Sequence, residues 1–167
     1  MSEKSLIFVT LGTSHYPFPR MIESLAPHLA RLEDDVRVVI QSGSTPQTDA
    51  VERAEWHAFI PRKSVDDYFS RASLVISHCG IGSIYSAREY ARPLILFVRQ
   101  KEFGEFSDDH QAQIAKEVRT NRHTALWSET EQSLQTLLDF VALGDRTRGT
   151  RVDLVNHEVA ARVASRL

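Results

Sequence analysis

Short apolar runs alternate with stretches of helical periodicity along most of the chain. Runs of strand length lie at 6–11, 36–40, 56–60, 74–76, 94–98 and 123–127. Between them apolar residues recur at a spacing of three or four, which predicts helices at about 21–32, 65–71, 82–90, from 108 onward, and 131–143. Strands that are apolar throughout and are separated by helices are typical of a parallel sheet covered on both faces. The pattern therefore predicts the α/β class, with a single parallel sheet.

The pattern changes after residue 143. Residues 144–151 are polar and contain two glycines, which predicts a linker. Beyond it, apolar residues at spacings of three or four predict an amphipathic helix over 152–167. Its apolar face would dock on its own domain or on another chain, and the pattern favours neither. The predicted organisation is a domain at 1–143, a polar linker at 144–151 and a C-terminal helix at 152–167.

Composition limits the classes of protein to consider. The 167 residues are 42% hydrophobic and 25% charged, which suits one globular domain and excludes a largely disordered chain. A formal net charge of −2 without a basic block gives no reason to expect nucleic acid as a partner. The single cysteine, Cys79, excludes an internal disulfide framework, and we expect it to be a small buried residue. The longest apolar stretch, 93–98, is far shorter than the ~20 residues of a membrane span, and the apolar run at 6–11 is too short for a signal peptide. We therefore expect a soluble, cytoplasmic protein.

The strongest local signal for chemistry is the segment SHCGIGS at 77–83, at a predicted strand-to-helix turn. Gly80 and Gly82 let the backbone approach a ligand closely. The new helix offers free N–H groups and the positive end of its dipole to an anion. Ser83 would cap that helix or bind a phosphate oxygen directly. The turn predicts a diphosphate site, and a tight turn without a ligand is the alternative.

Familiar phosphate-binding and nucleophile motifs are missing from this chain. The dinucleotide-binding fingerprint needs a third glycine where Tyr85 stands, and an acidic residue at the end of the second strand where Gln41 stands. A Walker-type loop and a GxSxG nucleophile elbow are also absent. No acidic pair lies beside the turn at 77–83, so these residues require no metal ion, and we expect no cofactor.

Two further loops would leave the same edge of the predicted sheet. The segment DDHQ at 108–111 begins a helix, and its two acids would cap that helix. His110 and Gln111 would project from the first turn toward the same cleft, where such side chains recognise hydroxyl groups. The segment GTSH at 12–15 follows the first strand and combines a glycine with polar side chains. We expect these loops to complete the site.

Taken together, these segments resemble the C-terminal, donor-binding half of family 28 glycosyltransferases. The resemblance covers nearly the whole chain and is carried by FVTLGT at 8–13, Pro17-Phe18 with Arg20, Gln41 and Gly43, Phe59-Ile60, LVISHCGIGSI at 74–84, Pro93 with Leu94-Ile95, and Gly104-Glu105 with DDHQ at 108–111. The chain is most similar to small subunits of two-chain enzymes, such as the PssE-type proteins of bacterial exopolysaccharide synthesis. It is also similar to the donor subunit of the eukaryotic dolichol-linked N-acetylglucosamine transferase. This implies a single Rossmann-like lobe, the C-terminal half of a GT-B glycosyltransferase, that binds a UDP-sugar.

The resemblance also implies roles for individual residues. The backbone at Ile60 would meet the uracil, with Phe59 packing nearby. Where the family has a glutamate that binds the ribose, this chain has Ser86, and Glu89 one turn later would substitute. Members that transfer glucuronic acid share this arrangement, which favours that donor sugar. His15, displaced by one position from the PssE pattern, is the local candidate for a general base. The other implied donor-binding residues are Gly12, Thr13, His78, Gly80, Gly82, Ser83, Asp109, His110 and Gln111.

From this resemblance we expect the donor-binding, catalytic subunit of a two-component inverting glycosyltransferase. It would move a sugar from a UDP-sugar to a lipid-linked saccharide in exopolysaccharide biosynthesis, and would be active only with a partner chain. A membrane-anchored, PssD-like partner would hold it at the inner face of the membrane as a peripheral protein. Two alternatives stay open: a non-catalytic UDP-sugar-binding accessory subunit that tunes a partner enzyme, and a Rossmann-like protein for another nucleotide.

Overall fold

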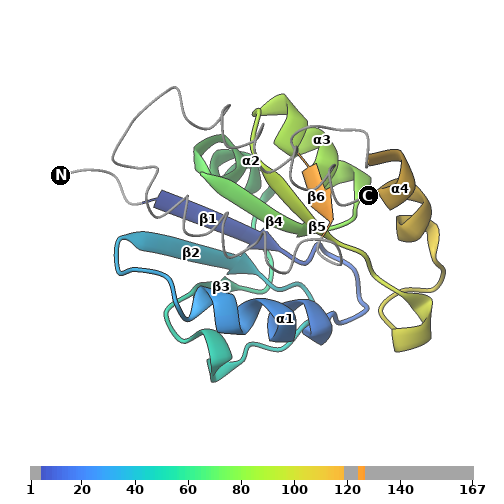
Figure 1. Cartoon of the computed structure of the whole chain (residues 1–167), viewed down its shortest axis with the longest axis horizontal. Coiled ribbons are helices and arrows are strands. Elements are labelled where there is room, and N and C mark those ends of the chain that lie inside the picture. Colours follow the sequence, from blue (N-terminus) through green and yellow to red (C-terminus); the bar gives the residue numbers. More distant parts are fainter. Residues whose placement is uncertain (1–4, 119–123, 127–167) are drawn as a thin grey trace, which may run out of the picture.

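Six parallel strands form one sheet in the computed structural model, which describes residues 5–118 and 124–126. The strand order is β3-β2-β1-β4-β5-β6 (Figure 1). The strands are β1 Ser5–Thr10, β2 Val36–Gln41, β3 Glu55–His57, β4 Leu74–His78, β5 Leu94–Phe97 and β6 Thr124–Leu126. The α-helices of these residues are α1 Pro19–Leu29, α2 Arg62–Arg71, α3 Ile81–Glu89 and α4 His110–Val118. The predicted α/β class with a single parallel sheet is confirmed.

The two faces of the sheet are covered by different helices because side chains of a strand alternate between faces. In β1, Ile7 and Val9 belong to the core that includes the apolar face of α1. Leu6 and Phe8 belong to the opposite core, which includes side chains from α2, α3 and α4. Every residue of β1 is buried, as expected for a central strand covered on both sides.

The third strand is shorter than the sequence predicts. It ends at His57 rather than Ile60, because the chain then runs beside the loop that follows β2, where the N–H of Gly43 donates to the Ala58 carbonyl at 2.8 Å. Pro61 then begins α2 three residues earlier than predicted. Its φ of −56° suits a helix start, and its carbonyl accepts the N–H of Val65 at 3.0 Å.

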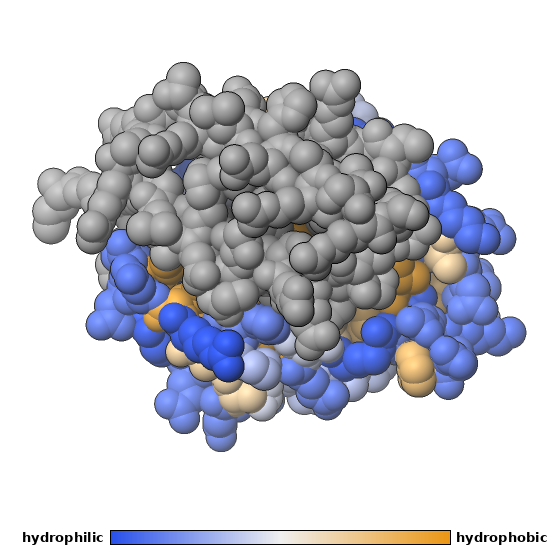
Figure 2. Space-filling model, in the orientation of Figure 1, coloured by the Kyte–Doolittle hydropathy of each residue, from blue (hydrophilic) through white to orange (hydrophobic). Residues whose placement is uncertain are grey.

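The predicted helices at 131–143 and 152–167 and the linker at 144–151 lie outside the described residues, so the division of the chain stays a prediction. In the coloured part of Figure 2, polar and charged residues dominate, with smaller apolar areas between them. Cys79 is fully buried, as predicted, and burial raises the pKa of its thiol to about 11.

No helix within residues 5–118 is long and apolar enough to cross a bilayer.

Candidate functional site

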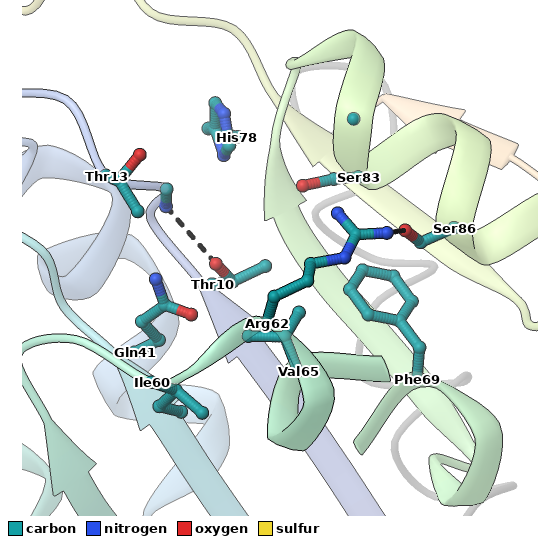
Figure 3. Close-up of a pocket in the computed structure, with 12 residues that line it drawn as sticks. Thr10, Thr13, Gln41, Ile60, Arg62, Val65, Phe69, His78, Ser83 and Ser86 are labelled. Carbon is teal, nitrogen blue, oxygen red and sulfur yellow. Dashed lines mark hydrogen bonds between the residues drawn. The ribbon is translucent and has the colours of Figure 1, made fainter. Parts of the chain in front are cut away.

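A pocket of about 320 Å³ opens at the carboxyl edge of the sheet, where the loops after β1 and β4 diverge (Figure 3). In an open α/β sheet this switch point between adjacent strands is where ligands bind. The pocket is lined by Thr10, Gly12, Thr13, Gln41, Ile60, Arg62, Val65, Phe69, His78, Gly82, Ser83 and Ser86. The structure therefore brings together Gly12, Thr13, Ile60, His78, Gly82 and Ser83 from the set predicted for the donor.

The N-terminus of α3 faces this pocket without a side-chain cap. Gly80 is the N-cap residue, and the first bond of the helix runs from the Ile84 N–H to the Gly80 carbonyl at 3.1 Å. The N–H groups of the first turn therefore have no acceptor within the helix and carry the positive end of its dipole. A Cβ built at Gly82 would meet nothing within 4 Å, so a ligand has room against this backbone. Ser83 lies inside the helix, and its hydroxyl points toward the pocket instead of capping the helix (Figure 3).

The ring of His78 packs between two glycines. A Cβ at Gly12 would lie 2.6 Å from its Cε1, and a Cβ at Gly80 would lie 2.3 Å from its Nε2. Gly12 also has a φ of +79°, which favours glycine in its own right. Gly80 was predicted to let a ligand approach, but it does not line the pocket and instead makes room for the imidazole. Of the two glycines of the turn, only Gly82 leaves open space for a ligand.

His78 is neutral at neutral pH. Burial and, to a smaller extent, the nearby Arg99 guanidinium lower the pKa of its imidazole to about 4, while a hydrogen bond with the Thr10 backbone opposes both effects. Its Nδ1 lies 3.3 Å from the hydroxyl of Ser77. A neutral imidazole has one donor and one acceptor nitrogen. His78 therefore contributes hydrogen-bonding groups to the pocket rather than a charge.

The lowered pKa of His78 predicts acid sensitivity. As the pH falls below the ordinary value of 6.5, the unfolded chain takes up a proton first and the folded chain does so only near pH 4. The free energy of unfolding should therefore fall by as much as about 3 kcal/mol between these pH values. Urea unfolding at pH 7.5 to 4 measures this for the native chain and for His78→Gln. The variant should lose less stability across the interval; equal losses would contradict the prediction.

Arg62 is the charged residue among those that line the pocket. It projects from the start of α2, and its Nη2 lies 3.4 Å from the hydroxyl of Ser86 (Figure 3). Sequence reasoning missed Arg62, although its place directly after Ile60 and Pro61 was a usable signal. Within residues 5–118 and 124–126, no carboxylate lines the pocket, and no group of three His, Cys, Asp or Glu side chains could bind a metal ion. The Nε of Arg62 is ion-paired with Asp66 at 3.0 Å, so the uncapped start of α3 is the main feature of the pocket that suits an anion.

Several residues predicted for the donor lie outside this pocket. The side chain of Phe59 is 62% exposed, and Glu89 is exposed at the last residue of α3. His15 is exposed with its ring 4.2 Å from that of Tyr16, between centroids. The structure therefore gives no support for Glu89 as the replacement for a ribose-binding carboxylate at Ser86, and the role of His15 as a base stays a prediction.

The segment 108–111 is held by bonds at the start of α4. An Asp108 oxygen accepts the His110 N–H at 3.0 Å and contacts the His110 ring, while Asp109 accepts the N–H of Lys101 at 2.9 Å. Gln111 is only 3% exposed, and its Oε1 accepts the N–H of Arg99 at 3.1 Å. The expectation that His110 and Gln111 face the same cleft as the turn at 77–83 is thus wrong for this pocket. Their contact with a donor sugar stays a prediction.

Comparison with known families settles what kind of domain carries this pocket. The family model described as "Glycosyltransferase family 28 C-terminal domain" matches residues 6–149. The chain belongs to this family.

Two relatives of this family 28 domain carry the name "UDP-N-acetylglucosamine transferase subunit ALG13". The one from Homo sapiens is 26% identical over 122 residues, which cover 70% of this chain and 10% of the human protein. The one from Yarrowia lipolytica is 28% identical over 140 residues, which cover 75% of this chain and 66% of the yeast protein. The chain therefore spans a tenth of one relative and just under two thirds of the other.

Solved structures show the same fold. MurG from Acinetobacter baumannii superposes with a TM-score of 0.58 at 17% identity, over 95% of this chain and 53% of that one. The calicheamicin glycosyltransferase CalG4 gives a TM-score of 0.60 at 18% identity, over 99% of this chain and 43% of the CalG4 chain. The family 28 domain thus corresponds to about half of each of these chains, which confirms the predicted half of a GT-B fold.

A buried guanidinium fixes the loop that leads from β1 into the pocket of this family 28 domain. Arg99, only 1% exposed, donates to the carbonyls of Leu11 at 2.7 Å, Tyr16 at 2.9 Å and Glu105 at 2.8 Å. Burial lowers its pKa to about 10, so it stays charged at neutral pH. The Glu105 carboxylate is bound twice by Arg20, at 2.8 and 2.7 Å. Arg99 was not predicted, because its partners are backbone carbonyls, and two of them, those of Leu11 and Tyr16, are far away in the sequence.

Proposed function

We propose that this family 28 domain is the donor-binding, catalytic subunit of a two-component inverting glycosyltransferase that uses a UDP-sugar. The observation that carries the proposal is the uncapped N-terminus of α3, with Gly82 and Ser83, in a pocket at the switch point of the sheet. Arg62 adds a positive charge to the lining of the same pocket, and its Nε is ion-paired with Asp66 of α2 at 3.0 Å. A diphosphate is the ligand whose charge this arrangement matches.

The other end of the pocket suits a nucleoside. Ile60, Val65 and Phe69 provide an apolar surface on the side of β3 and α2. Pockets of this size, mostly apolar with a few well-placed polar groups, are typical small-molecule sites. A UDP-sugar would therefore lie with its base toward Ile60 and its diphosphate at the start of α3.

In the proposed reaction, an acceptor hydroxyl attacks the anomeric carbon of the sugar as the bond to the UDP oxygen breaks. The configuration at that carbon inverts, the hydroxyl proton passes to a base, and the electron pair of the broken bond leaves on the diphosphate. The N–H groups of α3 and the hydroxyl of Ser83 stabilise this growing negative charge. Arg62 adds electrostatic attraction. We place the base on the partner subunit, with His15 as the candidate within this chain.

A partner chain completes the proposal. The printed names of the two relatives call each a subunit, and this domain corresponds to about half of the MurG and CalG4 chains. We propose a membrane-anchored partner that presents a lipid-linked saccharide, with glucuronic acid as the donor sugar and exopolysaccharide as the product. N-Acetylglucosamine, which the relatives' names contain, is the competing donor. Transfer assays with both donor sugars, run on each chain alone and on the complex, identify the donor and test whether a partner is needed. If the partner transferred sugar at the full rate without this chain, this chain would have only an accessory role.

Replacing Ser83 by alanine tests the diphosphate site. The variant loses one hydroxyl bond to a phosphate oxygen, so the Kd for UDP measured by calorimetry should rise about tenfold. Ser70→Ala is the matched control, since Ser70 is also helical but its hydroxyl donates to the Asp67 carbonyl outside the pocket. Equal affinity of the native chain for UDP and ADP would count against a uridine nucleotide. Unchanged binding in Ser83→Ala would remove Ser83 from the site.

A further inference from the structure

Arg20 and Glu105 form an ion pair between two segments that are far apart in the sequence. Arg20 lies in the first turn of α1, and Glu105 lies in the loop between β5 and α4. The Glu105 carboxylate accepts hydrogen bonds from Nε of Arg20 at 2.8 Å and from Nη2 at 2.7 Å. The Glu105 side chain is only 3% exposed, and the Arg20 side chain is 33% exposed. We call this ion pair the clasp.

The surroundings of the clasp indicate a role other than stabilising its own segments. Arg20 is the second residue of α1, where the positive end of the helix dipole disfavours a cation. Its guanidinium lies between the rings of Phe18 and Phe103, 5.4 and 5.2 Å from their centroids. Moving a carboxylate out of water costs free energy that a buried ion pair often fails to recover. Positions that depart from such local preferences are often functional.

The clasp reaches the loop after β1 through the backbone of Glu105. The guanidinium of Arg99 donates to the Glu105 carbonyl at 2.8 Å. The same guanidinium donates to the carbonyls of Leu11 at 2.7 Å and Tyr16 at 2.9 Å, which flank residues 12–15. One arginine therefore joins both ends of this loop to the backbone of the residue that the clasp fixes.

The loop after β1 carries Gly12 and Thr13, which line the pocket, whereas neither residue of the clasp does so. We propose that the clasp positions this loop for ligand binding, an inference that rests on the proposed function of the pocket. Arg20 and Glu105 are therefore positioning residues rather than catalytic ones. A loop that is ordered before the ligand arrives spares the complex the entropic cost of ordering it. Without the clasp, UDP itself must order the loop, and its affinity falls.

Two variants separate positioning from stability. Arg20→Met breaks the clasp and leaves the Glu105 carboxylate buried without its partner, so the thermal midpoint should fall. The double variant Arg20→Met/Glu105→Gln removes that unpaired charge and should regain most of the midpoint, while the clasp stays broken. Calorimetry well below both midpoints should show a Kd for UDP about tenfold higher in both variants than in the native chain.

The ion pair between Arg37 and Glu55 is the matched control. It joins β2 to β3 at 2.6 Å, again between separate segments, and its side chains are 40% and 41% exposed. Neither residue lines the pocket. The control variant Arg37→Met/Glu55→Gln should therefore bind UDP with the native Kd.

Hydrogen exchange at the amides of Gly12 and Tyr16, measured by NMR, needs no ligand. In the ligand-free chain, exchange should be faster in both clasp variants and native in the control. If the double variant regained the native Kd together with its midpoint, the pair would act on stability alone and the proposal would be overturned. Native exchange rates in both clasp variants would overturn it too. If the native chain binds no UDP, the proposed function fails, and the exchange rates alone decide whether the clasp holds the loop.

Discussion

Replacing Gly12 by alanine is expected to destabilise the domain by about 2–5 kcal/mol and to abolish UDP binding. Two costs combine at this position. The backbone has a φ of +79°, where a Cβ costs about 1–2 kcal/mol. The same Cβ would lie 2.6 Å from the ring of His78, which adds an overpacking cost of about 1–3 kcal/mol. Either the ring or the loop must move, and both line the pocket.

Gly104 offers a matched control for Gly12. Its φ is +68°, but a Cβ there meets nothing within 4 Å. Gly104→Ala should therefore lose only the backbone cost, about 1–2 kcal/mol in urea unfolding. The double variant Gly12→Ala/His78→Ala is compared with His78→Ala alone. Without the ring, Gly12→Ala should lower the free energy of unfolding only as much as Gly104→Ala does. If Gly12→Ala and Gly104→Ala lowered the free energy of unfolding equally, the His78 ring would move aside without cost, and the expectation would be wrong.

Replacing Arg99 by methionine is expected to cost about 3–5 kcal/mol of unfolding free energy. Methionine fills a similar volume but leaves the carbonyls of Leu11, Tyr16 and Glu105 without their donor. Arg99→Lys keeps the charge, yet a single ammonium group does not span the three carbonyls as the guanidinium does. Urea unfolding should therefore rank the native chain first, the lysine variant second and the methionine variant last.

A titration separates the charge of Arg99 from its structural role. Its positive charge helps to lower the pKa of His78, so the His78 pKa should rise from about 4 in Arg99→Met and stay low in Arg99→Lys. NMR titration of the imidazole measures this. Arg92→Met is the control, since Arg92 donates to the Ser70 carbonyl and is not among the groups that shift His78. The same low His78 pKa in all three variants would refute the electrostatic link.

The fold was predictable because its signals are local. The apolar run at 6–11 and the β-branched run at 36–40 became β1 and β2 within one residue at each end. The error at β3 has a physical source: Trp56 to Ile60 looks like a strand, but the residues after His57 meet a loop after β2 that no local pattern predicts. The role of Pro61 at the start of α2 was also missed, and α2 begins at Arg62 rather than near residue 65.

The site was predictable only where sequence neighbours build it. Gly82 and Ser83 follow directly from a strand-to-helix turn, and they line the pocket. Gln111 was misplaced because its partner is the backbone of Arg99, a contact that depends on how two loops meet. Gly80 was expected to serve the ligand, and its actual neighbour, the ring of His78, is apparent only from the placed side chain.

The strand order also governs how the chain reaches its folded state during synthesis. β1 lies in the middle of the sheet, where Ile7 pairs with Leu74 of β4, far along the sequence. As the chain leaves the ribosome, β1 can pair with β2 long before β4 exists, so one edge of a largely apolar strand stays open. Such an edge is prone to pair with other chains, and distant pairings form slowly. The pocket needs both β1 and β4, so the nucleotide that we propose for it would stabilise only the finished domain.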